Sequence, residues 1–474
     1  MTCENHSIEI KHINENTCFS RKIILIIGTI KDPCDHQVIE YSYNSSDIVK
    51  QSIFNGNFKI LLRLTEDTTS TLKIKYCQSE VDVSLLHKSI DPVIYDVKPL
   101  YIVPKNHDGK FQCDDNAENY ADIAAKKIDL MMELSQCVFS TKIIESEKEE
   151  WSFSLEKCEI FNSDLDVEDV RTMDQFELYD KIAAELIDKF GDEALKRRKF
   201  VGFMSCTRFL GLDPDEYYNY VNIKNKTQAS PSLSTGFLAL LGNGSFYALP
   251  NDLDEVIEAF QNKKIINVAK LLDDSNYRRT YGGCFATFLG SLIHEMGHIF
   301  DLGHTNSGLM GTDIDYVHRF FLCQYFTEIM PKRNISNCQQ MIKDENVLSN
   351  RITKIKKNGI YMEKYHEQKN NDLTFFEPNC LITLMNHKWF SQNANEDEIN
   401  FDEAERTVDS KNSLLVLVEI RESENKNSIL RKFWDLRNDK INQFQLPNDT
   451  ILENVTIFAM NGNGVTLRKH VNTK

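Results

Sequence analysis

Long hydrophobic runs and export signals are missing from this sequence. The N-terminus, MTCENHSIEIKHINENTC, lacks the basic start, the apolar run and the small-residue cleavage site of a secretory signal. The apolar run IILIIGTI is far shorter than the about 20 residues needed to span a bilayer, and it is typical of a buried strand. We therefore expect a cytoplasmic protein without a membrane partner.

The sequence also has no regularly spaced cysteines. Its 12 cysteines include no C-x-x-C pair and follow no rhythm. Such scattered cysteines are typical of separate reduced thiols in a cytosolic protein. They argue against both a disulfide framework and a thiolate metal site.

An excess of positive charge is absent too. The chain has 55 Lys and Arg against 71 Asp and Glu, which gives a net charge of -16. An acidic surface repels phosphate backbones, so we expect no nucleic-acid partner. The basic run KRRK at 196–199 matches a nuclear address, but it also ends a helical pattern, where cations offset the helix dipole. We favour the structural interpretation and keep the nucleus as the alternative location.

The pattern along the chain predicts a multidomain protein, since 474 residues exceed the roughly 100–200 of one domain. Residues 1–92 contain short alternating strands such as TLKIKYC, which predict a β-sandwich-like domain. Residues 93–330 alternate strands and helices, which predicts an α/β core. Within it, GFLALLGNGSFYALP at 236–250 predicts a hairpin turned by Gly-Asn-Gly. Residues 331–474 predict a helical segment followed by a small β-rich module.

The chemistry of the sequence is concentrated in SLIHEMGHIFDLGHTNSGLMG at 291–311. Apolar residues recur here at helical spacing, so the segment begins on a buried helix. His294 and His298 are four residues apart and leave the same helix face, as two imidazole ligands of one zinc ion require. Glu295 lies between them, where its carboxylate can act as a general base on a metal-bound water.

A third histidine follows after a turn. His304 is six residues beyond His298, so the helix must end before the His304 ring can reach the same metal. Asp301 or Gly303 can make that turn, because Gly adopts the left-handed conformation freely and Asp tolerates it better than most residues. The small-residue turn SGLMG then carries Met310, a polarizable side chain able to lie under the site.

The pattern HEMGHIFDLGH…GLM resembles the metzincin signature with its Met-turn. Together with YVHRFF, which follows it, the pattern resembles a set of zinc metalloproteinases of fungi and insects. The resemblance implies a zincin-like core with a mixed twisted sheet and an active-site helix, flanked by other domains; some members of the family end in a β-rich, lectin-like module. It implies zinc ligands at His294, His298 and His304, a general base at Glu295 and the Met-turn residue at Met310. The implied activity is zinc-dependent hydrolysis of a peptide or protein, with the 236–250 hairpin aligning the substrate.

This sequence departs from the signature at two places. Asp301 stands where the signature has Gly, which affects the turn that carries His304. No tyrosine follows Met310, where the sequence reads Gly311-Thr312, so stabilisation of the transition-state oxyanion falls to zinc and a further group.

Other interpretations stay open from the sequence. The histidines could be core residues, or the zinc could be a closed structural site in a non-catalytic scaffold, although a structural site needs no base such as Glu295. A glutamate zincin would take Glu328 as its third ligand. Cys137 or Cys206 could cap the zinc as a fourth ligand. His318 and His387 are interpreted as packing or surface residues.

Overall fold

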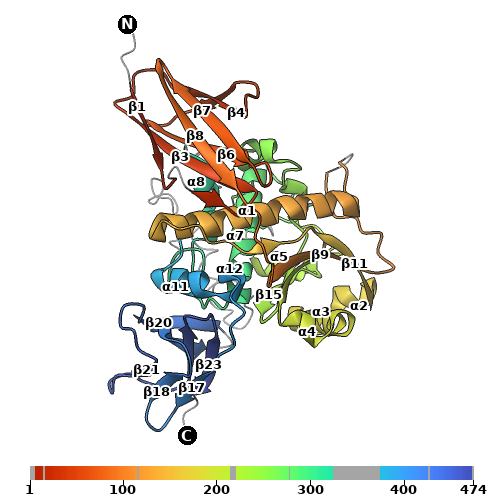
Figure 1. Cartoon of the computed structure of the whole chain (residues 1–474). Coiled ribbons are helices and arrows are strands. Elements are labelled where there is room, and N and C mark those ends of the chain that lie inside the picture. Colours follow the sequence, from red (N-terminus) through yellow and green to blue (C-terminus); the bar gives the residue numbers. More distant parts are fainter. Residues whose placement is uncertain are drawn as a thin grey trace, which may run out of the picture.

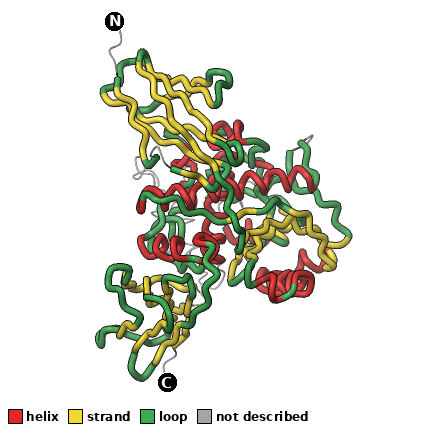
Figure 2. Tube along the Cα trace, in the orientation of Figure 1, coloured by secondary structure: helices red, strands yellow, loops and turns green. Residues whose placement is uncertain are grey.

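The computed structural model describes residues 6–13, 17–114, 117–213, 220–276, 278–323, 374–424 and 427–471. Strands of the N-terminal region lie at one end, a central body of sheet and helices follows, and strands of the C-terminal region lie at the other end (Figure 1, Figure 2). The protein is thus a multidomain mixed α/β structure with several sheets.

Two sheets form the N-terminal region, and their inner faces enclose a common apolar core. Strand β7 shows why, since every second residue from Ser70 to Tyr76 is buried and the residues between are exposed. The first sheet has the order β1-β3-β6 and consists of β1 (Ser7–Lys11), β3 (Ile23–Lys31) and β6 (Asn57–Arg63). The second has the order β2-β8-β7-β4-β5 and consists of β2 (Cys18–Phe19), β4 (Val38–Tyr43), β5 (Val49–Ser52), β7 (Thr69–Tyr76) and β8 (Ser79–His87).

The central sheet has the order β10-β9-β12-β16-β15, and β11 also pairs with β9. All its pairings are parallel except the one between β15 and β16, so the edge strand β15 runs against the rest. Its strands are β9 (Asp96–Lys105), β10 (Ser154–Leu155), β11 (Glu159–Asp166), β12 (Arg198–Met204), β15 (Ser232–Thr235) and β16 (Leu238–Gly242).

Helices cover both faces of this sheet. One core contains residues of α1 (Ala121–Glu147) and α7 (Tyr281–Ile299), and the opposite core contains residues of α2 (Val167–Thr172) and α3 (Gln175–Phe190). Smaller elements complete the central region: α4 (Asp192–Leu195), β13 (Arg208–Phe209), α5 (Tyr220–Asn225), β14 (Thr227–Gln228), η1 (Phe246–Ala248), η2 (Leu253–Glu255), α6 (Val256–Phe260), η3 (Ile314–Tyr316) and α8 (His318–Phe321).

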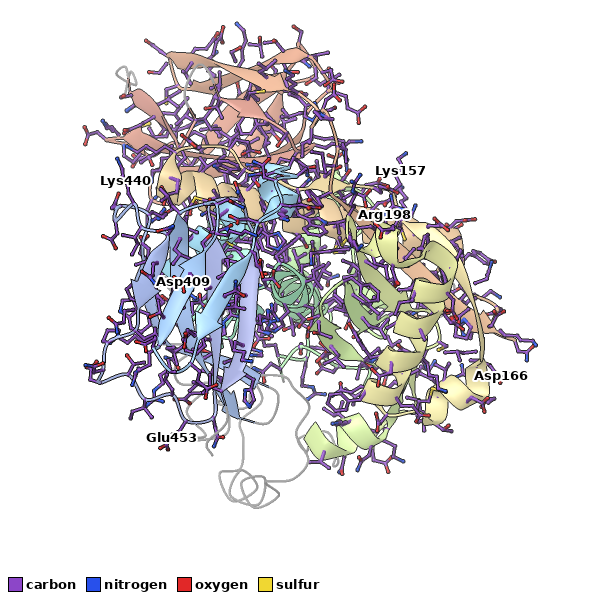
Figure 3. All side chains as sticks on the ribbon, turned by 60° about the horizontal axis from the view of Figure 1, so that its bottom comes forward. Lys157, Asp166, Arg198, Asp409, Lys440 and Glu453 are labelled. Carbon is purple, nitrogen blue, oxygen red and sulfur yellow. The ribbon has the colours of Figure 1, made fainter. Side chains whose placement is uncertain are left out.

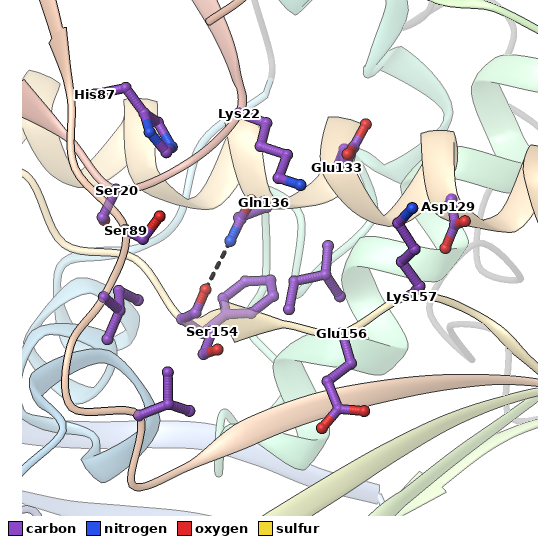
Figure 4. Close-up of a pocket in the computed structure, with 14 residues that line it drawn as sticks. Ser20, Lys22, His87, Ser89, Asp129, Glu133, Gln136, Ser154, Glu156 and Lys157 are labelled. Carbon is purple, nitrogen blue, oxygen red and sulfur yellow. Dashed lines mark hydrogen bonds between the residues drawn. The ribbon is translucent and has the colours of Figure 1, made fainter. Parts of the chain in front are cut away.

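A cavity of about 210 Å³ lies where the N-terminal strands meet α1 (Figure 4). Gln136 of α1 donates a hydrogen bond to the carbonyl oxygen of Phe153 at 2.6 Å along its wall, and Glu133 pairs with Arg63 of β6. None of the lining residues comes from the 291–311 segment, so this cavity belongs to the junction between the two regions.

The expected hairpin at 236–250 is wrong. Only β16 forms there, and it pairs with β15, which precedes it in the chain. Asn243 is buried and donates to the Tyr101 hydroxyl at 3.1 Å and to the Ser205 carbonyl at 2.8 Å, so the Gly-Asn-Gly segment is a core loop and not a hairpin turn. A 3₁₀ turn, η1, follows it.

The KRRK segment also differs from the expected helix end. Helix α3 ends before Gly191, whose φ is 76°, and the short helix α4 ends at Leu195, directly before the run. Arg198 and Lys199 belong to strand β12. Arg198, which Figure 3 labels, pairs with Asp96 at 2.7 Å and also with Glu156. Within the run, Lys196 directly follows a helix end, as the pattern predicted, whereas Arg198 makes its ion pairs from a strand.

The C-terminal region contains two small sheets, of order β17-β18-β21 and β20-β19-β22-β23. The expected boundary at 330/331, Glu328 and the helical segment that follows it lie outside the described residues. Before the strands, α11 and α12 pack into the same core as α1 and α7. The elements are α11 (Pro378–Asn386), α12 (Lys388–Ser391), β17 (Ile399–Asp402), β18 (Thr407–Ser410), β19 (Leu415–Glu424), β20 (Asn427–Asp435), β21 (Gln443–Gln445), β22 (Val455–Asn461) and β23 (Thr466–Val471).

None of the helices among the described residues combines the length and the apolar composition that a span of the bilayer requires.

Candidate metal centre

Helix α7 is buried on nearly every side, not only along the predicted stripe. The Thr280 hydroxyl caps its first turn by accepting from the Gly283 amide at 3.0 Å. Gly290 passes so close to the Ile314 carbonyl that a Cβ would lie 1.8 Å from its oxygen. The helix is therefore held rigidly, and the residues of its last turn are well positioned.

The three predicted histidines converge at the end of α7. The Nε2 atom of His298 lies 3.1 Å from Nε2 of His294 and 3.2 Å from Nε2 of His304. Two imidazole nitrogens on one tetrahedral zinc ion lie about 3.3 Å apart, given Zn–N bonds of about 2.0–2.1 Å. The three side chains thus fit a metal ion such as zinc.

Hydrogen bonds orient two of these rings. The Nδ1 atoms of His294 and His298 face the carbonyl oxygens of Leu309 and Leu302, at 2.8 and 2.9 Å. Because a carbonyl only accepts, each Nδ1 carries the proton and each Nε2 keeps its lone pair toward the common point. This is the tautomer that a metal ligand needs.

The pKa values of two of the histidines also agree with a role as metal ligands. Burial, followed by repulsion from His294, lowers the pKa of His298 to about 3. Burial, followed by repulsion from His298, lowers the pKa of His304 to about 2. Both rings are neutral at neutral pH, and a neutral imidazole is the form that binds metal.

The turn between His298 and His304 is made by Asp301. Its φ is 67°, in the left-handed region, whereas Gly303 is not among the residues of positive φ. The Arg468 guanidinium donates to the Asp301 carboxylate at 2.6 Å, and His387 lies 3.4 Å from it. Burial alone raises the pKa of Asp301. The Arg468 charge and the His387 hydrogen bond outweigh burial and hold this pKa well below its ordinary value. Asp301, which replaces the Gly of the signature, therefore both makes the turn and provides an anion for Arg468.

The C-terminal strands complete the turn from outside. The Leu430 amide of β20 donates to the His304 carbonyl at 2.8 Å. Arg421 of β19 is buried, donates to the Asp301 carbonyl at 3.0 Å and pairs with Glu419 at 2.6 Å. Sequence reasoning missed these contacts, because more than a hundred residues separate them from the motif. In the sequence, only the acidic residue at 301 indicated that a cation from a distant part of the chain would lie beside the turn.

Glu295 is 8% exposed and lies beside the edge strand. The Ser232 hydroxyl of β15 donates to its carboxylate at 2.9 Å, and the Ser234 hydroxyl donates to the other oxygen. Glu295 directly follows His294 near the end of α7. The two serines are further residues of the site that the sequence pattern did not reveal.

Met310 lies directly beneath α7. Its side chain is fully buried, and its sulfur would lie 2.3 Å from a Cβ on Gly297, the residue just before His298. The Thr305 amide donates to the Met310 carbonyl at 2.9 Å and so ties the turn after His304 to this residue. The glycine of the motif thus makes room for the methionine against the last turn of α7.

We expect the Asp301→Ala variant to hold metal about 10–100-fold more weakly, the usual cost of losing a residue that orients a ligand. It removes the anion that Arg468 contacts and puts a residue that avoids positive φ at the turn. Zinc retention against a chelator measures the effect. Asp301→Gly should restore only the backbone part, and Asp439→Ala, at an exposed aspartate, should have no effect. Full zinc retention by Asp301→Ala would contradict the role of this turn.

Together these features define a class: a mixed α/β protein with a three-histidine site on a core helix, beside a carboxylate and an antiparallel edge strand. Residues 7–390 match a family described as a putative peptidase family, and the chain belongs to that family.

Curated relatives carry related names. The putative zinc metalloproteinase YIL108W of Saccharomyces cerevisiae is 29% identical over 85 residues, 18% of this chain and 12% of the relative. The putative zinc metalloproteinase C607.06c of Schizosaccharomyces pombe is 19% identical over 345 residues, 67% of this chain and 54% of the relative. The chain therefore spans about half the length of one relative and far less of the other. Among solved structures, OgpA from Akkermansia muciniphila aligns over 81% of this chain and 94% of its own, with 12% identity and a TM-score of 0.41.

Proposed function

We propose that the protein is a zinc metallopeptidase of metzincin type that hydrolyses peptide bonds of a peptide or protein substrate. The observation that carries the proposal is the convergence of three Nε2 atoms at the end of α7, with Glu295 on the same helix turn. Membership of a peptidase family and the zinc metalloproteinase names of the relatives support it.

In this proposal His294, His298 and His304 hold Zn²⁺ through Nε2. When bound, the zinc ion lowers the pKa of water toward about 7 and polarises the scissile carbonyl. Glu295 accepts the proton of the attacking water and passes it to the leaving amine. The hydroxyls of Ser232 and Ser234 hold its carboxylate in one orientation.

Strand β15 is proposed to align the substrate. It lies at the end of the sheet order, and its serines contact Glu295, so an extended peptide that adds to its outer edge would pass the general base. This transfers the role expected for the 236–250 hairpin to the strand that precedes β16.

Metal removal tests the proposal on the full chain. We expect the zinc-loaded protein to cleave members of a diverse peptide library, a strong chelator to abolish cleavage, and added Zn²⁺ to restore it. Mass spectrometry of the products locates the cleaved bonds. Peptide cleavage that persists after complete zinc removal, or a zinc-loaded protein that cleaves nothing in the library, would favour the scaffold interpretation.

A further inference from the structure

A second group of metal-binding atoms lies in the N-terminal region, away from the three histidines. His6, Cys34 and Cys77 bring one ligand atom each to within 4.8 Å of one another. His6 directly precedes β1, Cys34 follows β3, and Cys77 lies in the tight turn between β7 and β8. The three residues therefore come from both N-terminal sheets, whose strands lie at one end of the molecule (Figure 1).

The spacing of the two sulfur atoms suits a shared metal ion. The Sγ atoms of Cys34 and Cys77 lie 3.5 Å apart. Two thiolates on one tetrahedral zinc ion lie about 3.8 Å apart, given Zn–S bonds of about 2.3 Å, whereas a disulfide needs about 2.05 Å. The observed separation is close to the first value and far from the second.

His6 supplies the second, independent observation. Its Nε2 atom is buried and has no hydrogen-bond partner among the described residues. The His6 amide donates to the Ser79 hydroxyl of β8 at 2.8 Å, and its ring packs edge-on against Tyr76 at 5.1 Å. A buried imidazole nitrogen without a partner costs free energy, and a metal ion bound through Nε2 would remove that cost.

We propose that His6, Cys34 and Cys77 bind a second, structural zinc ion that crosslinks the two N-terminal sheets. One imidazole and two thiolates are a donor set that Zn²⁺ favours among the common divalent cations. The scattered cysteines gave no such signal in the sequence, because the two ligands come from turns of different strands and not from a local C-x-x-C pair. The site is independent of the peptidase activity proposed above.

Zinc counting on the full chain tests this site. With both centres filled we expect two zinc ions per chain in the wild type and one in each of the variants Cys34→Ser, Cys77→Ser and His6→Ala. Cys18→Ser is the matched control, since Cys18 is a half-buried thiol of β2 in the same region, and it should retain both ions.

Cobalt substitution separates the two centres by their donor atoms. We expect cobalt-loaded wild type to show a thiolate-to-cobalt charge-transfer band in the near ultraviolet. The band should vanish in Cys34→Ser and persist in His304→Ala, because the histidine centre contains no sulfur. Failure of the histidine centre alone would leave this band in place.

Three results would overturn the assignment. The first is a zinc content in Cys34→Ser and Cys77→Ser equal to that of the wild type, and the second is the absence of any thiolate charge-transfer band in the cobalt-loaded protein. The third is a Cys34–Cys77 disulfide, detected in the protein purified without reductant as the loss of two titratable thiols after unfolding.

Discussion

The variant Glu295→Gln is expected to lose peptide turnover by about 10²–10⁴-fold, the usual contribution of a general base, while it keeps its metal. Glutamine has nearly the same shape and can still hydrogen-bond to Ser232 and Ser234, but it cannot accept the proton of the attacking water. The measurement is kcat on a cleaved library peptide, together with zinc content. Glu177→Gln, at an exposed glutamate of α3, is the control and should behave as the wild type.

Either of two results would contradict this role for Glu295. Unchanged turnover in Glu295→Gln would mean that the carboxylate takes no part in catalysis. Loss of zinc would mean that Glu295 binds the metal directly, which its hydrogen bonds to two serines of β15 argue against.

The second large effect is expected for His304→Ala. This variant should lose one zinc ion per chain and all measurable peptide turnover, because two imidazoles on one helix face leave the metal without a third protein ligand. Zinc content and turnover on the same samples are the measurements. His470→Ala removes an exposed histidine of β23 and should change neither.

If His304→Ala keeps its zinc with unchanged affinity, the third ligand lies elsewhere and the metzincin type is wrong. Glu328, which lies outside the described residues, would then be the next candidate. Comparison with Cys34→Ser shows which of the two proposed zinc ions a variant has lost, since only the cysteine variant should lose the cobalt–thiolate band.

Much of the candidate site could be predicted from local sequence. The four-residue spacing of His294 and His298 places both on one face of any helix, and the apolar repeat around them predicts that helix. The six-residue step to His304 requires a turn, and only Asp301 and Gly303 suited it. These features depend only on residues close together in the sequence, so a local sequence pattern can predict them.

The errors came from contacts that span the fold. The 236–250 segment has the local signature of a hairpin, but Asn243 donates to Tyr101 of β9 and to Ser205, which directly follows β12. The strand order then makes β15 the edge strand. A pattern of two apolar runs and a glycine turn contains no information about either.

The sequence by itself therefore determined the helix that carries His294 and His298, the spacing of these histidines and the acidic, helix-and-strand character of the chain, because these follow from local periodicity and composition. Only the tertiary structure decided that Asp301 makes the turn, that Arg421 and Arg468 support it from the C-terminal strands, and that serines of β15 hold Glu295. It also brought His6, Cys34 and Cys77 together. The physical reason is the same in each case, since strand pairing and core packing join residues that no local pattern relates.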